Sequence, residues 1–168
     1  MTKRAYRNLQ ALLLLATLFV LASSYYFQYV KGLHPCPLCI MQRICAFFLG
    51  MLCLMGALLA TLKRGRHVAG FQMFFAAAGL FFSGRQLWLQ SLPPEQTPAC
   101  MPGLDILVRY FPLKDVMHAL VWGAGDCAEV SWKWLGVSMP GWAALYFAAM
   151  FIGSALLFLK AGQAIKAE

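Results

Sequence analysis

Apolar residues fill four long stretches of the chain, and short segments carrying most of the charges separate them. The stretches span residues 9–30, 38–62, 68–90 and 140–160, approximately. A hydrocarbon core about 30 Å thick needs about 20 apolar residues in an α-helix, so each stretch is long enough to cross a membrane. We therefore predict an all-α integral membrane protein, a four-transmembrane-helix bundle in which residues 1–168 form a single membrane domain.

Two segments, residues 31–37 and 91–139, join these helices on the same side of the membrane. In the longer one, bulky apolar groups alternate with charges from Leu113 to Trp122, which predicts a short amphipathic helix lying on the membrane surface. The alternative is a small helix packed on its own loop. Four tryptophans suit an interfacial belt that holds this loop down. They are Trp122, Trp132, Trp134 and Trp142.

Composition supports the membrane assignment, because 61% of the residues are hydrophobic and only 12% are charged. Soluble domains are about half apolar and about a quarter charged. The net charge of +8 would suit a nucleic-acid binder, but the basic residues form short clusters between apolar stretches. We expect no nucleic-acid partner. The basic N-terminus before the first stretch resembles a signal peptide, yet that stretch exceeds a signal core of about 7–15 residues. We therefore expect an uncleaved helix.

The loop charges predict the orientation of the bundle. Eight basic residues share one side, opposed only by Glu168. They are Lys3, Arg4, Arg7, Lys63, Arg64, Arg66, Lys160 and Lys166. The segment 91–139 has three basic and five acidic residues, a net charge of 3 − 5 = −2. Because short cytoplasmic loops are rich in Lys and Arg, we expect both termini in the cytoplasm and both cysteine-bearing loops in the periplasm or its equivalent.

Four of the six cysteines lie in or beside the predicted outer loops, where disulfides persist. Cys36 and Cys39 form Cys-Pro-Leu-Cys at the mouth of the second helix, and Cys100 and Cys127 lie in the long loop. The small ring closed by Cys-x-x-Cys is suited to thiol exchange. The remaining two, inside the second helix, are expected to be apolar packing residues. These are Cys45 and Cys53.

A structural disulfide and half of a zinc site are the alternatives for Cys36 and Cys39. Zinc sites usually recruit a second close pair or a spaced His. Here Cys100 and Cys127 stand 127 − 100 = 27 positions apart with no His near either, and no histidine in the chain has ligand spacing. We therefore favour redox chemistry without a metal. The competing hypothesis is a membrane metal-binding or structural protein that uses the four outer cysteines as ligands or staples.

The residues around Cys36 and Cys39 suggest different surroundings for the two sulfurs. Pro35 and Pro37 bias the backbone against helix, so Cys36 is expected outside the helix and exposed to an exchanging thiol. Cys39 is expected to face the membrane, with Arg43 one turn deeper on the same helix face. An Arg inside a membrane helix indicates function, here stabilisation of a thiolate, and the alternative is snorkelling to the interface. Arg85, near the outer end of the third helix, either lines the same site or snorkels.

Several motifs together resemble the bacterial disulfide bond formation protein B family (DsbB), across essentially the whole chain. They are Cys36-Pro37-Leu38-Cys39 with Gln42-Arg43, Gly84 with Gln86-Leu87, Gly125-Asp126-Cys127-Ala128-Glu129, and Trp132, Leu135-Gly136 and Met139-Pro140. Two positions depart from the family pattern. Ser91 stands where members can carry a His, and the residues around Cys100 differ from those expected at the docking cysteine.

The resemblance implies a four-helix enzyme of the bacterial inner membrane. It implies that a Cys100–Cys127 disulfide accepts electrons from the reduced thioredoxin-like oxidase DsbA, with Cys100 forming the mixed disulfide. Cys127 then exchanges with Cys36. Cys39 is left as a thiolate against a membrane quinone, ubiquinone or menaquinone, and Arg43 stabilises its charge. Arg85 is a further candidate contact to the quinone.

Overall fold

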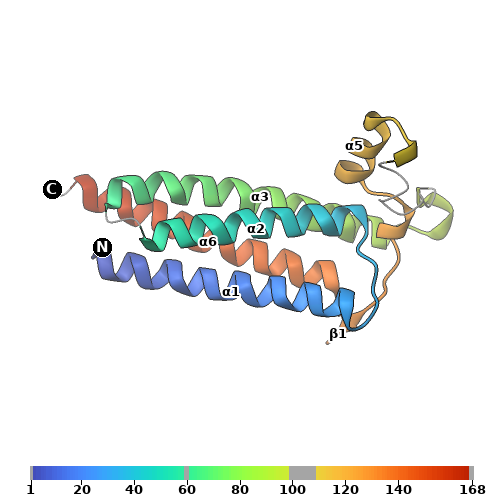
Figure 1. Cartoon of the computed structure of the whole chain (residues 1–168), viewed down its shortest axis with the longest axis horizontal. Coiled ribbons are helices and arrows are strands. Elements are labelled where there is room, and N and C mark those ends of the chain that lie inside the picture. The colour runs from blue at the N-terminus through green and yellow to red at the C-terminus, as the bar shows by residue number, and fades with distance from the viewer. Residues whose placement is uncertain (1, 59–60, 99–108, 167–168) are drawn as a thin grey trace.

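The computed structural model describes residues 2–58, 61–98 and 109–166. Within them, four helices have the length and apolar content to cross a membrane, which confirms the predicted all-α membrane architecture. They are α1 (Lys3–Tyr29), α2 (Pro37–Leu58), α3 (Leu62–Ser91) and α6 (Met139–Lys166). The helices lie side by side with both chain termini at one end (Figure 1). We call this the terminal end, and the opposite one the loop end.

The helix boundaries differ from the apolar stretches at several ends. α1 begins at Lys3 and α6 continues to Lys166, beyond the stretches 9–30 and 140–160. Charged side chains near helix ends reach the membrane interface, so an apolar stretch is shorter than the helix that contains it. The described part of α2 ends at Leu58, and Leu62, expected at the end of the second stretch, begins α3.

The bundle turns apolar groups outward and buries amides, as a bundle surrounded by lipid does. Many large apolar side chains, such as Phe19 and Phe74, are exposed. Gln10 and Gln72 are fully buried, and the Nε2 atom of Gln72 donates a 2.8 Å hydrogen bond to the Oε1 atom of Gln10. The same Nε2 atom lies 3.2 Å from the sulfur of Cys53. These contacts tie α1, α2 and α3 together through polar groups that lipid could not satisfy.

α3 is the central helix of the bundle. It packs along α6 and α2, α1 packs mainly on α2, and α1 and α6 contact each other only sparsely. Gly79 of α3 has no side chain, and the ring of Phe147 on α6 occupies the space that a Cβ atom at this position would need. This close approach holds α6 against α3. α6 meets α1 at few places, one of them the 2.8 Å hydrogen bond that the Tyr146 hydroxyl donates to the Thr17 hydroxyl.

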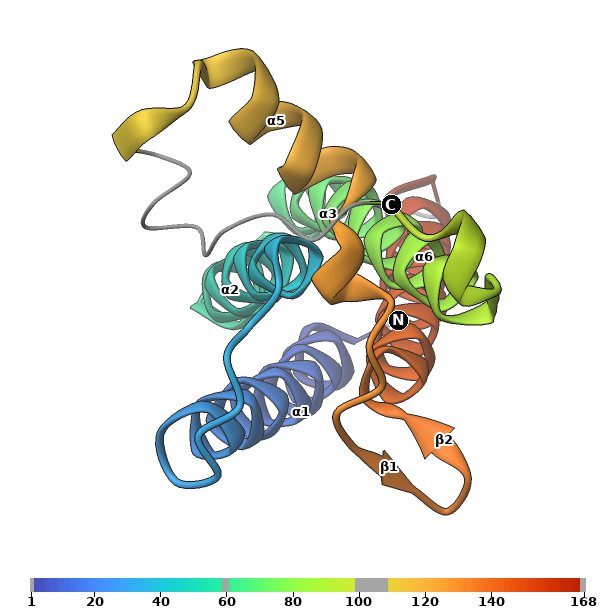
Figure 2. The ribbon, with the colours of Figure 1, turned by 90° about the vertical axis from the view of Figure 1, so that its right-hand side faces the viewer.

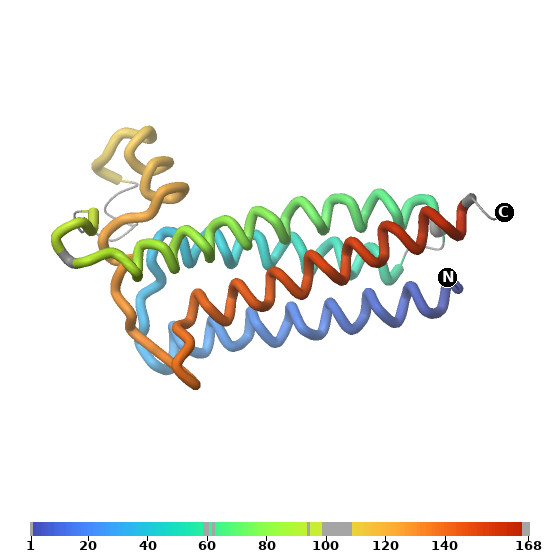
Figure 3. The backbone as a smooth tube through the Cα atoms, turned by 180° about the vertical axis from the view of Figure 1, so that it is seen from behind, coloured from blue at the N-terminus to red at the C-terminus, as the bar shows by residue number. Residues whose placement is uncertain are grey.

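The segment between α3 and α6 covers the loop end (Figures 2 and 3). It contains the amphipathic helix α5 (Leu113–Trp122), whose limits coincide with the predicted ones. Val116 and Ala119 of α5 are buried, and α5 packs against α2. Short elements accompany it. They are the 3₁₀ turns η1 (Pro94–Gln96) and η2 (Gly125–Cys127), and the unpredicted hairpin of β1 (Lys133–Trp134) and β2 (Val137–Ser138).

Gly123 brings the chain from α5 back onto the bundle. Its backbone has φ +83° and ψ 162°, a conformation that is essentially reserved for glycine. A Cβ atom at this position would also lie 2.8 Å from the Leu38 side chain and 2.7 Å from that of Leu89. The turn therefore presses η2, which ends in Cys127, onto the start of α2.

Candidate functional site

Three cysteine sulfurs meet where α2 begins. Cys36 immediately precedes α2, Cys39 lies in its first turn, and Cys127 ends η2. The Sγ atoms of Cys36 and Cys39 are 2.9 Å apart. The Cys36 side chain is also hydrogen-bonded to that of Cys127. Cys36 therefore stands between two sulfurs, one from its own helix and one from the long loop.

The expected exposure of Cys36 is wrong. The residue lies outside the helix, as its flanking prolines predict, but it is only 9% exposed. The reason is tertiary, because the turn at Gly123 places η2 over the start of α2 and Cys127 itself is fully buried. Cys39, in contrast, is half-buried and borders a cavity.

Gln86 of α3 contacts both sulfurs of the Cys-x-x-Cys pair. Its Nε2 atom lies 3.4 Å from the Sγ atom of Cys36 and 3.3 Å from that of Cys39. The Nε2 atom of Gln42 donates a 2.8 Å hydrogen bond to the Oε1 atom of Gln86. Because Oε1 accepts this bond, the Nε2 donor of Gln86 is directed at the sulfurs. Both glutamines belong to the motifs of the chain, but no role was expected for either from the sequence.

A cavity of about 620 Å³ opens between α1 and α6 at the loop end. Its volume lies in the usual range for small-molecule sites, and its walls are mainly apolar. The sparse contact between α1 and α6 leaves this space. The β1–β2 hairpin helps to enclose it, and the indole rings of Trp134 and Trp142 pack there at 5.3 Å. The lining side chains with polar or reactive atoms include Cys39, Arg43, Gln86, His34, Trp132 and Tyr146.

Arg43 reaches from α2 across to α1. Its Nε atom donates a 2.6 Å hydrogen bond to the Ser24 hydroxyl, and Nη2 donates one of 3.1 Å to the Ser24 carbonyl. Nη1 donates to the Gln28 side-chain oxygen, and the guanidinium lies 5.3 Å from the centroid of the Tyr25 ring. Arg43 is therefore held by α1, where it borders the same cavity as Cys39. This geometry favours a role in the cavity over snorkelling.

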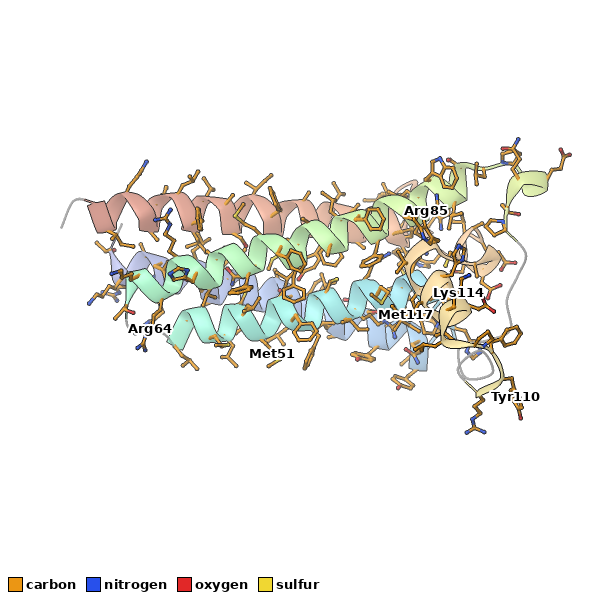
Figure 4. All side chains as sticks on the ribbon, turned by 90° about the horizontal axis from the view of Figure 1, so that it is seen from above. Met51, Arg64, Arg85, Tyr110, Lys114 and Met117 are labelled. Atoms are coloured by element: carbon orange, nitrogen blue, oxygen red, sulfur yellow. The ribbon has the colours of Figure 1, made fainter. Side chains whose placement is uncertain are left out.

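Arg85 does not border the cavity. Its guanidinium lies 4.1 Å from the Trp88 ring centroid and 5.3 Å from that of Trp122, and Nε donates a 3.1 Å hydrogen bond to the Trp122 carbonyl. The residue is at the loop end, close to α5 (Figure 4). The geometry therefore gives no support to a contact between Arg85 and a bound cofactor. It indicates that Arg85 fastens the end of α5 to α3.

The remaining candidates have different positions. His34, for which its spacing predicted no role, lines the cavity, and its place two residues before Cys36 was the available signal. Cys45 and Cys53 are buried in the bundle. Cys100 lies outside the described residues. Within residues 2–58, 61–98 and 109–166, no three His, Cys, Asp or Glu side chains are grouped so that they could hold a metal ion.

The hydrogen bond between Cys36 and Cys127 sets their acidities apart. Cys36 lowers the pKa of Cys127 by bonding to its sulfur, and backbone hydrogen bonds from Leu38 and Ala124 act in the same direction. The pKa of Cys36 is raised, because its hydrogen bonds with Cys127 and Cys39 favour its thiol form. Since the thiolate is the nucleophile in disulfide exchange, the lowered pKa of Cys127 favours attack by its sulfur.

Comparisons with known proteins agree with this arrangement. Residues 6–157 match the family model described as Disulfide bond formation protein DsbB. Disulfide bond formation protein B of Stutzerimonas stutzeri is 41% identical over 147 residues, which cover 87% of this chain and 90% of that protein. Its counterpart in Marinobacter nauticus is 42% identical over 142 residues, 84% of each chain. Disulfide bond formation protein B 1 of Pseudomonas aeruginosa is 37% identical over 155 residues, covering 92% and 95%.

Proposed function

The chain belongs to the DsbB family of disulfide bond formation proteins, and from that premise we propose that it re-oxidises a DsbA-type thioredoxin-like oxidase with a membrane quinone as electron acceptor. The proposal places it in the bacterial inner membrane, with both termini in the cytoplasm and the loop end in the periplasm. The excess of Lys and Arg near the terminal end supports this orientation.

One observation carries the proposal. The sulfur of Cys36 is next to both Cys39 and Cys127, and Cys39 is also on the wall of the cavity that contains Arg43. Disulfide exchange requires the attacking sulfur to reach the sulfur under attack. Here Cys127 of the loop lies beside Cys36, and Cys39 borders a cavity large enough for a ligand.

The thiol chemistry then proceeds by four successive disulfide exchanges. A thiolate of the reduced partner attacks Cys100 in a Cys100–Cys127 disulfide, which forms a mixed disulfide and releases Cys127 as a thiolate. Cys127 attacks Cys36 in a Cys36–Cys39 disulfide, which forms a Cys36–Cys127 bond and leaves the electron pair on Cys39. The second partner thiol then attacks the mixed disulfide, so the partner leaves oxidised and Cys100 is released as a thiolate. Cys100 attacks Cys127 in the Cys36–Cys127 bond, which re-forms the Cys100–Cys127 disulfide and releases Cys36 as a thiolate. The dithiol has lost two electrons and two protons, and they reside on Cys36 and Cys39.

The residues of the cavity suit a quinone. The apolar walls would accept its ring and tail, Arg43 would supply a positive charge to its oxygens, and Gln86 offers an amide donor beside Cys39. When bound, ubiquinone or menaquinone would accept the two electrons and two protons and leave as quinol. An acceptor of high potential is required, because DsbA is a strong oxidant near −120 mV and each 30 mV uphill costs about 1.4 kcal/mol.

The test follows the absorbance of ubiquinone-1 over time, with the full chain in detergent and a reduced DsbA-type partner. We expect loss of the oxidised-quinone band with the intact protein and none with Cys39→Ser. Cys45→Ala, a buried cysteine away from the cavity lining, is the matched control and is expected to retain turnover. Full turnover without Cys39 would refute the relay. Stoichiometric bound zinc in an inactive protein would favour the metal-ligand hypothesis instead.

A further inference from the structure

A second, smaller pocket lies at the terminal end, between α3 and α6. It has a volume of about 360 Å³ and is lined by Lys63, Arg66, His67, Phe158 and Ile165. Three of its five lining residues carry basic groups, and the other two are apolar. We call it the terminal-end pocket. The disulfide chemistry proposed above, at the opposite end of the bundle, makes no use of it.

Arg66 is held in place within this pocket. Its guanidinium lies 4.6 Å from the centroid of the Phe158 ring, a cation–π contact between α3 and α6. Gly162, one turn after Phe158, also borders the guanidinium, since a Cβ atom there would be in van der Waals contact with the guanidinium carbon at 3.4 Å. Stacking occupies a face of the guanidinium and leaves the N–H groups at its edge available, so Arg66 is a preorganised donor.

The positive charge of the pocket is not neutralised by the described part of the protein. No ion pair or hydrogen bond joins Lys63, Arg66 or His67 to any carboxylate among the described residues. The described acidic residues belong to the segment between α3 and α6, at the loop end (Figure 1). They are Glu95, Asp115, Asp126 and Glu129. The pocket is thus suited to an anion that the described residues do not supply.

We propose that the terminal-end pocket binds the phosphate of an anionic phospholipid headgroup. The fork of Arg66 matches phosphate oxygens, and Lys63 adds charge beside it. Basic pockets between transmembrane helices are known sites for such headgroups. The apolar part of the lipid would follow Phe158 and the exposed Phe71, which lies one turn from His67 on the same face of α3. Free phosphate shares the headgroup chemistry but lacks this apolar contact.

Charge near the terminal end has a simpler explanation, since any short cytoplasmic loop is rich in Lys and Arg. Arg64 distinguishes a specific phosphate site from this general excess of basic residues. It carries the same charge, two residues from Arg66, but it is exposed and does not line the pocket. It lies on the outside of the bundle at the end opposite Arg85 (Figure 4). Arg64→Gln and Arg66→Gln therefore remove equal charge from the same end of α3, and only the second removes a pocket donor.

The experiment measures the thermal unfolding midpoint of the full chain in detergent by tryptophan fluorescence. Phosphatidylglycerol, phosphatidylcholine with the same acyl chains, and inorganic phosphate are titrated separately. We expect phosphatidylglycerol alone to raise the midpoint. Arg66→Gln is expected to require about fivefold more phosphatidylglycerol for half the shift, while Arg64→Gln follows the unmodified protein.

Lys63→Gln is a second pocket variant that should not disturb folding, because Lys63 is exposed and has no partner in the described part of the chain. We expect it to weaken the response to phosphatidylglycerol about fivefold as well, with an unchanged midpoint in the absence of lipid. Equal responses of Arg64→Gln and Arg66→Gln would overturn the proposal. So would an equal shift with phosphatidylcholine, or a shift reproduced by inorganic phosphate, which would assign the site to the free anion.

Discussion

The Nε2 atom of Gln42 donates a 2.8 Å hydrogen bond to the Oε1 atom of Gln86, and this contact directs the amide nitrogen of Gln86 at two sulfurs. Both side chains are almost fully buried. The pair links α2 to α3 at the place where Cys36 and Cys39 meet. A neutral donor beside the cysteine pair stabilises negative charge on sulfur without adding a charge of its own.

Gln86→Leu is expected to slow quinone reduction about tenfold or more, because a hydrogen bond to a charged group contributes about 1.5–3 kcal/mol. Gln42→Leu should have a smaller effect, since it frees the Gln86 amide to rotate without removing it. Initial rates measured at several ubiquinone-1 concentrations give kcat and KM separately. The loss should appear mainly in kcat if Gln86 acts on the sulfur. A change confined to KM would contradict that role.

Arg43→Ala is expected to raise the KM for ubiquinone-1 about tenfold, the loss of about 1.4 kcal/mol of binding. The guanidinium borders the cavity and is oriented by Ser24 and Gln28. Arg43→Lys retains the charge but cannot make the same set of hydrogen bonds, so an intermediate KM is expected. As a control, Arg85→Gln should leave KM unchanged, because Arg85 is outside the cavity. A larger effect at Arg85 than at Arg43 would reverse the assignment.

The lowered pKa of Cys127 predicts a pH dependence in the reduced protein. Its thiolate should persist at pH values below the ordinary thiol range, near 8.5, and be lost as the pH falls through the lowered pKa. Cys36→Ala removes the largest cause, so the titration should move upward. Thiolate ultraviolet absorbance would be compared between two proteins whose other cysteines are Ala, with Cys127 present and either Cys or Ala at position 36. Identical midpoints would show that Cys36 does not tune Cys127.

Gly79→Ala is expected to destabilise the bundle by about 1–3 kcal/mol, the usual cost of overpacking. The added Cβ atom would overlap the Phe147 ring and push α6 from α3. Gly84→Ala, on the same helix, has nothing within 4 Å of the added carbon and serves as the matched control. Thermal unfolding in detergent measures both. A midpoint as low for Gly84→Ala as for Gly79→Ala would attribute the effect to the helix itself rather than to the contact.

The sequence alone was sufficient for the features that depend on neighbouring residues. Apolar length predicted four membrane-spanning helices, and alternating apolar and charged groups predicted the helix from Leu113 to Trp122. Two prolines kept Cys36 outside the helix, because proline restricts its own backbone and that of the residue before it. Each of these signals acts over a few residues or one helix, so no knowledge of packing was needed.

Tertiary structure decided which side chains share a site. Cys36 is buried because Gly123 turns a distant loop onto it, and Arg43 bonds to α1 residues that lie 15–19 positions earlier in the chain. Arg85 lies on tryptophans instead of in the cavity. The cavity itself exists because α6 packs closely on α3 and only sparsely on α1. Such contacts join residues far apart in the sequence, and hydropathy, which fixes where a helix spans, does not specify the neighbour it packs against.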